Sequence, residues 1–191
     1  MADIKNYYPK LLGWEGGFVN DPTDRGGATN KGVTISTFKL MGYDNDGDGD
    51  IDVSDLKLMT NEQGMGICKK GYWDRWQADK IISQAVAESL VEWVWGSGKW
   101  GIIIPQRLLG IKDDGIVGPK TIDAMNKATA PIFHEKLRLA KLNFIDGIVS
   151  YSISEYKKTH PNPTEDELLK HTQKRFEKGW KRRINAFIYQ L

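Results

Sequence analysis

The stretch "WEGGFVNDPTDRGGATNKGVT", residues 14–34, decides how the first part of the chain is organised. It places one carboxylate, Glu15, between Trp14 and two glycines, and continues with residues that favour turns. Glycine tolerates the left-handed conformation that often closes a helix, so the two glycines are expected to end a first helix at about 3–14. "FVN" and "ATNKGVT", on either side of "DPTDRGG", then predict a short antiparallel hairpin.

Apolar residues recur at helical spacing through most of the remaining chain. The further helices are expected at about 34–41, 61–75, 79–97, 100–109, 118–128, 131–157 and 165–189. Two of them begin with a reciprocal capping pair, Thr60 with Gln63 and Thr164 with Glu167. The sequence therefore predicts a mainly α protein with one small antiparallel β-hairpin.

The composition is that of an ordinary globular protein, with 191 residues, 40% hydrophobic and 27% charged. A net charge of +2 gives no overall field that favours nucleic acid, so no nucleic-acid partner is expected. No apolar run reaches the length of a membrane span. The first residues lack the features of a signal peptide. We therefore expect a protein made in the cytoplasm without a signal peptide.

Cysteine and histidine offer little chemistry. The single Cys68 cannot form an intramolecular disulfide and lies in an apolar helical pattern, so a buried free thiol is expected. His134, His160 and His171 lack the spacing of zinc ligands.

Glu15 is the candidate general acid. At the last turn of a helix the negative end of the helix dipole disfavours a second negative charge, and apolar neighbours also favour the protonated form. A glycosidase needs such a carboxyl group to protonate the leaving oxygen. Asp24 and Thr29, on the expected hairpin, could hold a water on the far side of a bound sugar. The alternative is that Glu15 only caps or pairs, and that the acidic residues after it only form turns.

"EGGFVNDPTDRGGATNKGVT" closely resembles the signature segment of glycoside hydrolase family 108, the bacterial and phage N-acetylmuramidases. The similarity continues through "YWDRW" (72–76), "GSG" (96–98) and "RFEKGWKRR" (175–183). The resemblance implies a lysozyme-like helical fold, with Glu15 at the position of the family's catalytic glutamate. The Glu, Asp, Thr order is also similar to that of phage-type lysozymes, although the threonine arrives one residue early, which makes Thr34 a rival of Thr29.

The sugar-binding residues expected beside this set are Asn30, Thr34, Trp73 and Trp95. Five tryptophans fall between residues 73 and 100, and aromatic faces commonly line carbohydrate sites.

The segment "LLGIKDDGIVGPKTIDAMN", residues 108–126, resembles a peptidoglycan-binding-like C-terminal region. Its turn is expected at Asp114 and Gly115, with Pro119 in the first turn of the next helix. We therefore expect a lysozyme-like catalytic lobe at 1–98 and a helical peptidoglycan-binding-like lobe at 99–191, packed as one unit. A purely structural helix–turn–helix without a ligand is the alternative.

Residues 44–55, "DNDGDGDIDVSD", match the twelve-residue calcium loop of EF-hand and dockerin-type sites, inserted into the catalytic lobe. The expected ligands are the side chains of Asp44, Asp46, Asp48 and Asp55, the carbonyl of Asp50, and Asp52 directly or through water. The loop predicts a structural calcium ion, held weakly because an aspartate replaces the bidentate glutamate at the last position. A solvated acidic turn is the alternative. No organic cofactor is implied.

Together these features predict a peptidoglycan hydrolase that cuts the β-1,4 bond between N-acetylmuramic acid and N-acetylglucosamine. Its partners would be peptidoglycan glycan strands in the periplasm or outside the cell, with a holin or an export system to reach them, as for a phage or prophage endolysin, an autolysin or a secretion accessory. Two alternatives remain open: a lytic transglycosylase, and a non-catalytic cell-wall or calcium-binding secretion adaptor.

Overall fold

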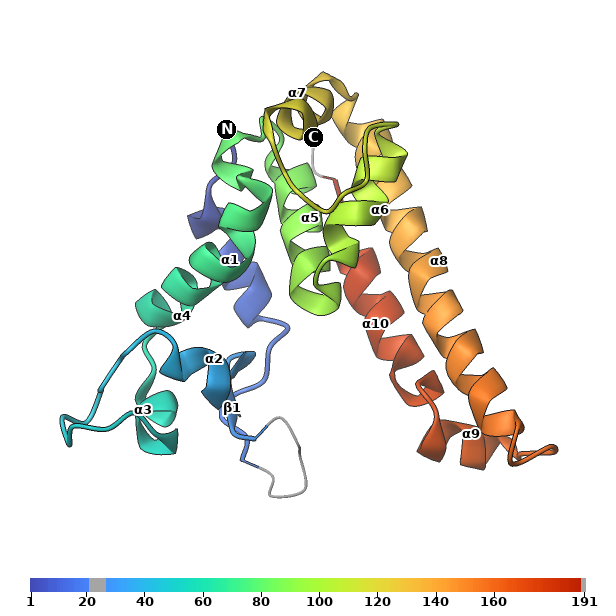
Figure 1. The fold of residues 1–191 in the computed structure, drawn as a ribbon, viewed down its shortest axis with the longest axis horizontal. Coiled ribbons are helices and arrows are strands. Elements are labelled where there is room, and N and C mark those ends of the chain that lie inside the picture. The colour runs from blue at the N-terminus through green and yellow to red at the C-terminus, as the bar shows by residue number, and fades with distance from the viewer. Residues whose placement is uncertain (21–26, 190–191) are drawn as a thin grey trace. The chain divides into compact units, whose positions relative to one another are not determined.

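The computed structural model describes residues 1–20 and 27–189. Over these residues the expected fold class is confirmed: the chain is mainly α, with one two-stranded antiparallel sheet (Figure 1). Backbone contacts divide it into two compact units, Met1–Lys80 and Ile81–Leu191. The domain boundary expected at 98/99 stays a prediction, since contacts group residues 81–98 with the second unit.

The first unit contains short elements: α1 (Ile4–Leu12), β1 (Thr29–Asn30), β2 (Val33–Thr34), α2 (Ile35–Lys39), α3 (Val53–Leu58) and α4 (Asn61–Cys68). Thr60 and Gln63 form the predicted capping box of α4. The helix expected at 61–75 is α-helical only to Cys68 and continues as a π-helical turn at Lys69–Trp73 and 3-10 turns at Asp74–Trp76 and Ala78–Lys80. This change of winding accompanies complete burial of Trp73 and Trp76.

The β-ribbon lies within "ATNKGVT". Thr29 pairs with Thr34 and Asn30 with Val33, and the two connecting residues, Lys31 and Gly32, both have positive φ, at 50° and 77°. Such a two-residue turn matches the natural twist of a hairpin. The expected pairing of "FVN" with this segment is present as a single bridge, between Val19 and Thr29.

Close packing of α1 on α4 depends on a glycine. A Cβ at Gly64 would lie 2.1 Å from the hydroxyl oxygen of Tyr8, which is itself buried. Only a residue without a side chain lets the two helices approach this closely.

The second unit contains longer helices: α5 (Gln84–Ser97), α6 (Trp100–Leu108), α7 (Pro119–Lys127), α8 (Ala130–Lys157), α9 (Glu165–His171) and α10 (Lys174–Ala186). The predicted start of α5 at 79 is wrong, because Ser83 caps the helix by accepting a hydrogen bond from the Val86 N–H. In the described part of the chain, no helix has both the length and the apolar character that a membrane crossing requires.

The single helix expected at 165–189 is two helices. Thr172 has extended backbone angles, and its hydroxyl donates to the carbonyl of Leu168 at 2.6 Å while accepting from the Lys174 N–H at 3.2 Å. The side chain therefore replaces backbone hydrogen bonds at the break. The capping box of Thr164 and Glu167 starts α9 as predicted.

α5, α8 and α10 form the core of the second unit, with α6 folded back along α5. In Figure 1, α10 runs beside α8. Ile145 and Val149 of α8 and Ile184 of α10 form one buried cluster between these helices.

Candidate active site and acidic loop

Glu15 lies just beyond α1. The helix ends at Leu12, and the backbone N–H groups of Trp14 and Glu15 both donate to the carbonyl of Leu11, at 2.9 and 3.1 Å. The expectation that Glu15 occupies the last helical turn is wrong, because Gly13, a weak helix former, already serves as the cap. The side chain of Glu15 is half-buried.

Two proton-bearing side chains, from the end of α4 and the following turn, lie within electrostatic reach of this carboxyl group. Burial raises the pKa of the Cys68 thiol to about 12, and the charge of Glu15 adds to the rise. Burial also raises the pKa of Tyr72, with a smaller contribution from Glu15. Both groups therefore stay neutral at ordinary pH. Cys68 is a buried free thiol, as expected.

Tyr72 is a further candidate for the site that the sequence did not single out. It is half-buried and within electrostatic reach of Glu15. The signal that could have found it is the "YWDRW" segment, in which only the tryptophans drew attention.

Thr29 and Thr34 lie on the same face of the ribbon, because they are direct cross-strand partners. The other pair, Asn30 and Val33, faces the core and is buried. The Thr34 hydroxyl is engaged at the start of α2, where it accepts from the Thr37 N–H at 3.3 Å and donates to the Thr37 hydroxyl at 3.1 Å. The Thr29 hydroxyl reaches the carbonyl of Gly27 only at 3.5 Å, so it is the more available of the two.

Asp24, the predicted partner of Glu15, lies outside the described residues. Its part in the site stays a prediction.

Asn30 is only 4% exposed, and its amide donates to the carbonyls of Leu56 at 2.8 Å and Lys57 at 3.3 Å. It therefore fastens the ribbon to the end of α3 instead of facing a sugar. Lys31 does the same from the turn, because its ammonium donates to the carbonyl of Met59 at 3.0 Å.

The tryptophans divide between core and surface. Trp73 is fully buried, and its indole N–H donates to Asp79 at 2.6 Å. It therefore packs in the core, and this burial does not fit the sugar-binding role expected of it. Trp95 belongs to the second unit and is half-buried. Trp14, next to Glu15 in the chain, is also half-buried, which leaves part of an aromatic ring accessible near the candidate acid.

The acidic loop closes around Asp55. This carboxylate is buried and accepts hydrogen bonds from the backbone N–H groups of Asn45, Asp46 and Asp52. Donation by these backbone groups lowers its pKa. The first aspartate, Asp44, accepts from the N–H groups of two glycines farther along the loop, at 2.6 and 3.1 Å.

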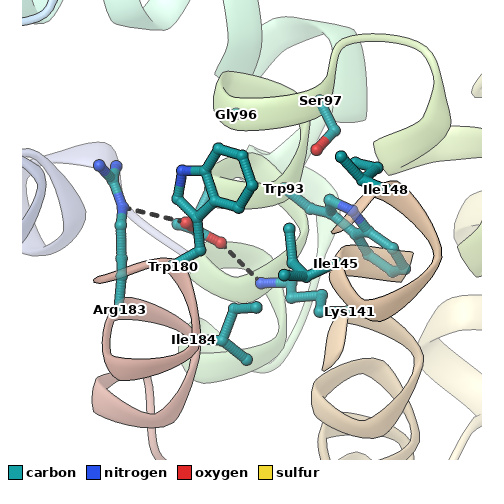
Figure 2. Close-up of a pocket in the computed structure, with 10 residues that line it drawn as sticks. Trp93, Gly96, Ser97, Lys141, Ile145, Ile148, Trp180, Arg183 and Ile184 are labelled. Carbon is teal, nitrogen blue, oxygen red and sulfur yellow. Dashed lines mark hydrogen bonds and ion pairs between the residues drawn. The ribbon is translucent and has the colours of Figure 1, made fainter. Parts of the chain in front are cut away.

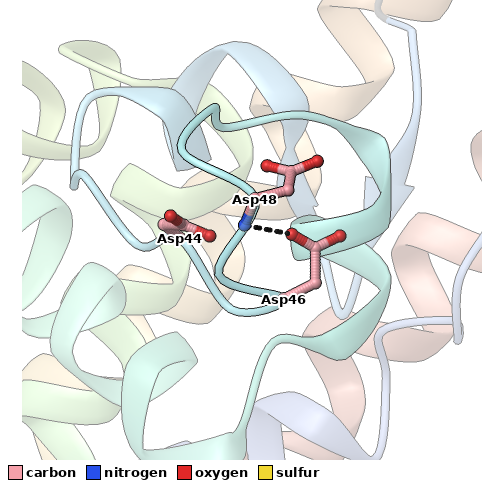
Figure 3. Close-up of side chains that lie close together, drawn as sticks. All are labelled: Asp44, Asp46 and Asp48. Carbon is pink, nitrogen blue, oxygen red and sulfur yellow. Dashed lines mark hydrogen bonds between the residues drawn. The ribbon is translucent and has the colours of Figure 1, made fainter.

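Carboxylate oxygens converge within this loop. Those of Asp44, Asp46 and Asp48 lie within 4.8 Å of one another (Figure 3). Those of Asp46, Asp52 and Asp55 form a second such set, so the two sets share Asp46 and together contain five of the six expected ligands. All are oxygen donors, which calcium prefers.

Mutual repulsion accompanies this crowding. Desolvation and the charges of Asp48, Asp55 and Asp44 raise the pKa of Asp46. The charge of Asp48 is the largest cause of the raised pKa of Asp50. A divalent cation would relieve this repulsion, so the residues present fit a calcium ion.

In the second unit, buried Gln106 holds the turn between α6 and α7. Its amide nitrogen donates to Asp114 at 3.2 Å and to the carbonyl of Ile116 at 3.0 Å, and its oxygen accepts from the Gly115 N–H at 2.9 Å. Gly115 has φ 76°, and Pro119 begins α7, as predicted for this segment.

We expect Gln106→Glu to destabilise the second unit by about 1–3 kcal/mol, because a carboxylate removes both donors and faces an acceptor carbonyl and Asp114. Urea unfolding measures the change. Lys112→Gln is the control, since Lys112 is an exposed residue of the same turn. Equal unfolding midpoints for wild type and Gln106→Glu would show that the hydrogen bonds of the Gln106 side chain contribute nothing to stability.

Comparison with known proteins defines the class. Residues 8–98 match the model of glycosyl hydrolase 108, and residues 100–185 match a domain described as a predicted peptidoglycan domain. The chain thus consists of a segment that matches glycosyl hydrolase 108 followed by a segment that matches a predicted peptidoglycan domain, and the two matches together support a family of peptidoglycan hydrolases.

Among solved structures, the chain is similar to the structure of Brucella abortus SagA, with a TM-score of 0.70 and 24% sequence identity. The match covers 96% of this chain and 90% of that one, and at this identity it supports the fold. No match to a curated protein was found.

Proposed function

We propose that the chain is an N-acetylmuramidase that hydrolyses the β-1,4 bond between N-acetylmuramic acid and N-acetylglucosamine, with Glu15 as the general acid. One observation carries the proposal. Within a segment that matches glycosyl hydrolase 108, Glu15 is a half-buried carboxyl group within electrostatic reach of two neutral groups, Cys68 and Tyr72.

In the proposed reaction, Glu15 gives its proton to the glycosidic oxygen as the bond from that oxygen to the anomeric carbon breaks. A water adds to the anomeric carbon from the other face of the sugar, and Asp24 takes its proton. Thr29 orients the water, because its hydroxyl is less committed than that of Thr34.

The two threonines give a matched pair of variants. Thr29→Val is expected to lower the cleavage rate about tenfold, the value of one lost hydrogen bond to the water, with little change in stability. Thr34→Val removes the cap of α2 and is expected to cost about 1 kcal/mol of stability with a smaller effect on the rate. Initial rates on purified peptidoglycan and thermal melting of both variants measure this. The reverse pattern would assign the water to Thr34.

The products distinguish the proposal from its rivals. Mass spectrometry of digested peptidoglycan should show reducing muramic acid ends. Products with 1,6-anhydro ends would make the protein a lytic transglycosylase, in which the muramic hydroxyl attacks in place of water. Glycan binding without any cleavage would favour the secretion adaptor.

We also propose that residues 44–55 bind one structural calcium ion. The support is two sets of neighbouring carboxylate oxygens that share Asp46, one from Asp44, Asp46 and Asp48 and one from Asp46, Asp52 and Asp55, which are five positions of the calcium-loop pattern. The loop precedes α3, which Asn30 fastens to the ribbon that carries Thr29. The ion would therefore stabilise the ribbon through α3 and Asn30.

Calcium at about 100 times its dissociation constant is expected to raise the thermal midpoint by roughly 5–10 °C. Asp46→Asn should abolish the rise, because Asp46 belongs to both oxygen sets. Asp50→Asn is the matched control: it removes one charge of the loop but keeps the carbonyl that would ligate the ion. Calorimetric titration to millimolar calcium without any heat of binding would refute the site.

A further inference from the structure

A pocket of about 170 Å³ lies in the second unit, between α5, α8 and α10 (Figure 2). Its walls are apolar, with Trp93, Trp180 and three isoleucines from α8 and α10. An apolar cavity of about 150 Å³ is large enough to bind benzene. The pocket can therefore accept a group of about six non-hydrogen atoms.

The polar end of the pocket carries two cations and one carboxylate. Lys141 donates to Glu92 at 2.8 Å and Arg183 donates to the same carboxylate at 3.1 Å, drawn as the two dashed lines in Figure 2. The pocket lining thus has a surplus of one positive charge. A ligand that brings one negative charge would balance it.

Lys141 also has unused hydrogen-bonding capacity. Its side chain is only 3% exposed, and an ammonium group has three N–H donors. Within the described residues, Glu92 is its one hydrogen-bond acceptor, and its ammonium nitrogen also lies 5.8 Å from the centroid of the Trp93 ring. A buried donor favours an acceptor, so the ammonium group is prepared for a ligand oxygen at the pocket.

We infer that this pocket binds the carboxyl end of a short peptide whose last residue is small and apolar. An alanine residue with a free carboxylate has about six non-hydrogen atoms, which matches the pocket. Its carboxylate accepts from Lys141 and completes a set of two cations and two anions, while its methyl group lies against the isoleucines and Trp180. Peptidoglycan stem peptides can end in this way. The inference rests on the proposed function, and it gives the second unit a peptide subsite separate from the cleaved glycan bond.

The test uses N-acetyl-D-alanyl-D-alanine and its C-terminal amide as probes, titrated into the full chain carrying Glu15→Gln. Calorimetry and tryptophan fluorescence follow binding, because Trp93 and Trp180 line the pocket. We expect the free acid to bind at least tenfold more tightly than the amide, because the amide lacks the carboxylate that would pair with the buried ammonium group of Lys141. Equal affinities for the two probes, or no binding at millimolar peptide, would overturn the inference.

Gly96 provides a blocking variant that should keep the fold. It lines the pocket near the end of α5, and a Cβ there would meet no atom within 4 Å. Gly96→Leu should therefore weaken binding of the free acid at least tenfold. Gly147→Leu, a change of the same kind at an exposed position of α8 outside the pocket, should bind as the parent does.

If Gly96→Leu binds the probe as tightly as the parent, the pocket is not the binding site. The result is separable from the cleavage reaction, which is measured on glycan products with Glu15 intact. Cleavage without peptide binding would refute only the subsite, and peptide binding without cleavage would refute only the muramidase.

Discussion

Glu15→Gln is expected to abolish peptidoglycan cleavage while leaving the fold intact. The amide keeps the shape of the side chain but has no proton to give to the leaving oxygen. General acid catalysis typically contributes about 10²–10⁴ to the rate, so the residual activity should fall below detection in a turbidity assay. The thermal midpoint should change little, because Glu15 lies beyond the end of α1 and is only half-buried.

Glu62→Gln is the matched control, since Glu62 is an exposed glutamate in the first turn of α4 of the same unit. It should clear cell walls at the wild-type rate. The proposed mechanism would be refuted by a Glu15→Gln protein that also clears them at that rate.

Gly101→Ala is expected to destabilise the second unit by about 3 kcal/mol or more, at the upper end of overpacking costs. The added Cβ would lie 2.5 Å from the backbone nitrogen of Val94 and 2.6 Å from the carbonyl carbon of Trp93. These are backbone atoms of α5, which cannot turn aside as a flexible side chain does. α6 must therefore move away from α5.

Thermal melting with Gly96→Ala as the control measures this. Gly96 lies in α5, where an added Cβ meets open space, so the exchange should stabilise by about 0.5–1 kcal/mol through helix propensity. If both alanine variants melt at the same temperature, the close approach of α5 and α6 is not a constraint on the sequence.

Helix starts that depend on residues close together in the chain could be predicted from the sequence. The capping boxes at Thr60 and Thr164 and the start of α7 at Pro119 lie where predicted, because each depends on contacts within one helical turn. The break at Thr172 was not readable. A threonine hydroxyl can bond to the carbonyl four residues earlier either inside a continuous helix or at a helix end, and tertiary packing decides which of the two occurs.

The candidate site was predictable in its chemistry and less so in its geometry. Glu15 was proposed from its segment and stays a prediction, and its place in the structure depends on Gly13 ending α1 early. Asn30 and Trp73 are residue types that often bind sugars, yet both side chains are buried. Tertiary packing decides which face of the two-residue strand and which side of the π-helical turn is buried, and the sequence does not show this. The place of Tyr72 within electrostatic reach of Glu15 follows from the same packing.

The buried thiol of Cys68 has a consequence for redox tolerance. Oxidants and disulfides react with the thiolate form, which is scarce for a group whose pKa is raised to about 12 and whose sulfur is enclosed in the core. It is also the chain's single cysteine, so folding requires no disulfide. The same native structure can therefore persist in a reducing interior and in an oxidising exterior, and glutathione disulfide should modify the protein only once it has unfolded.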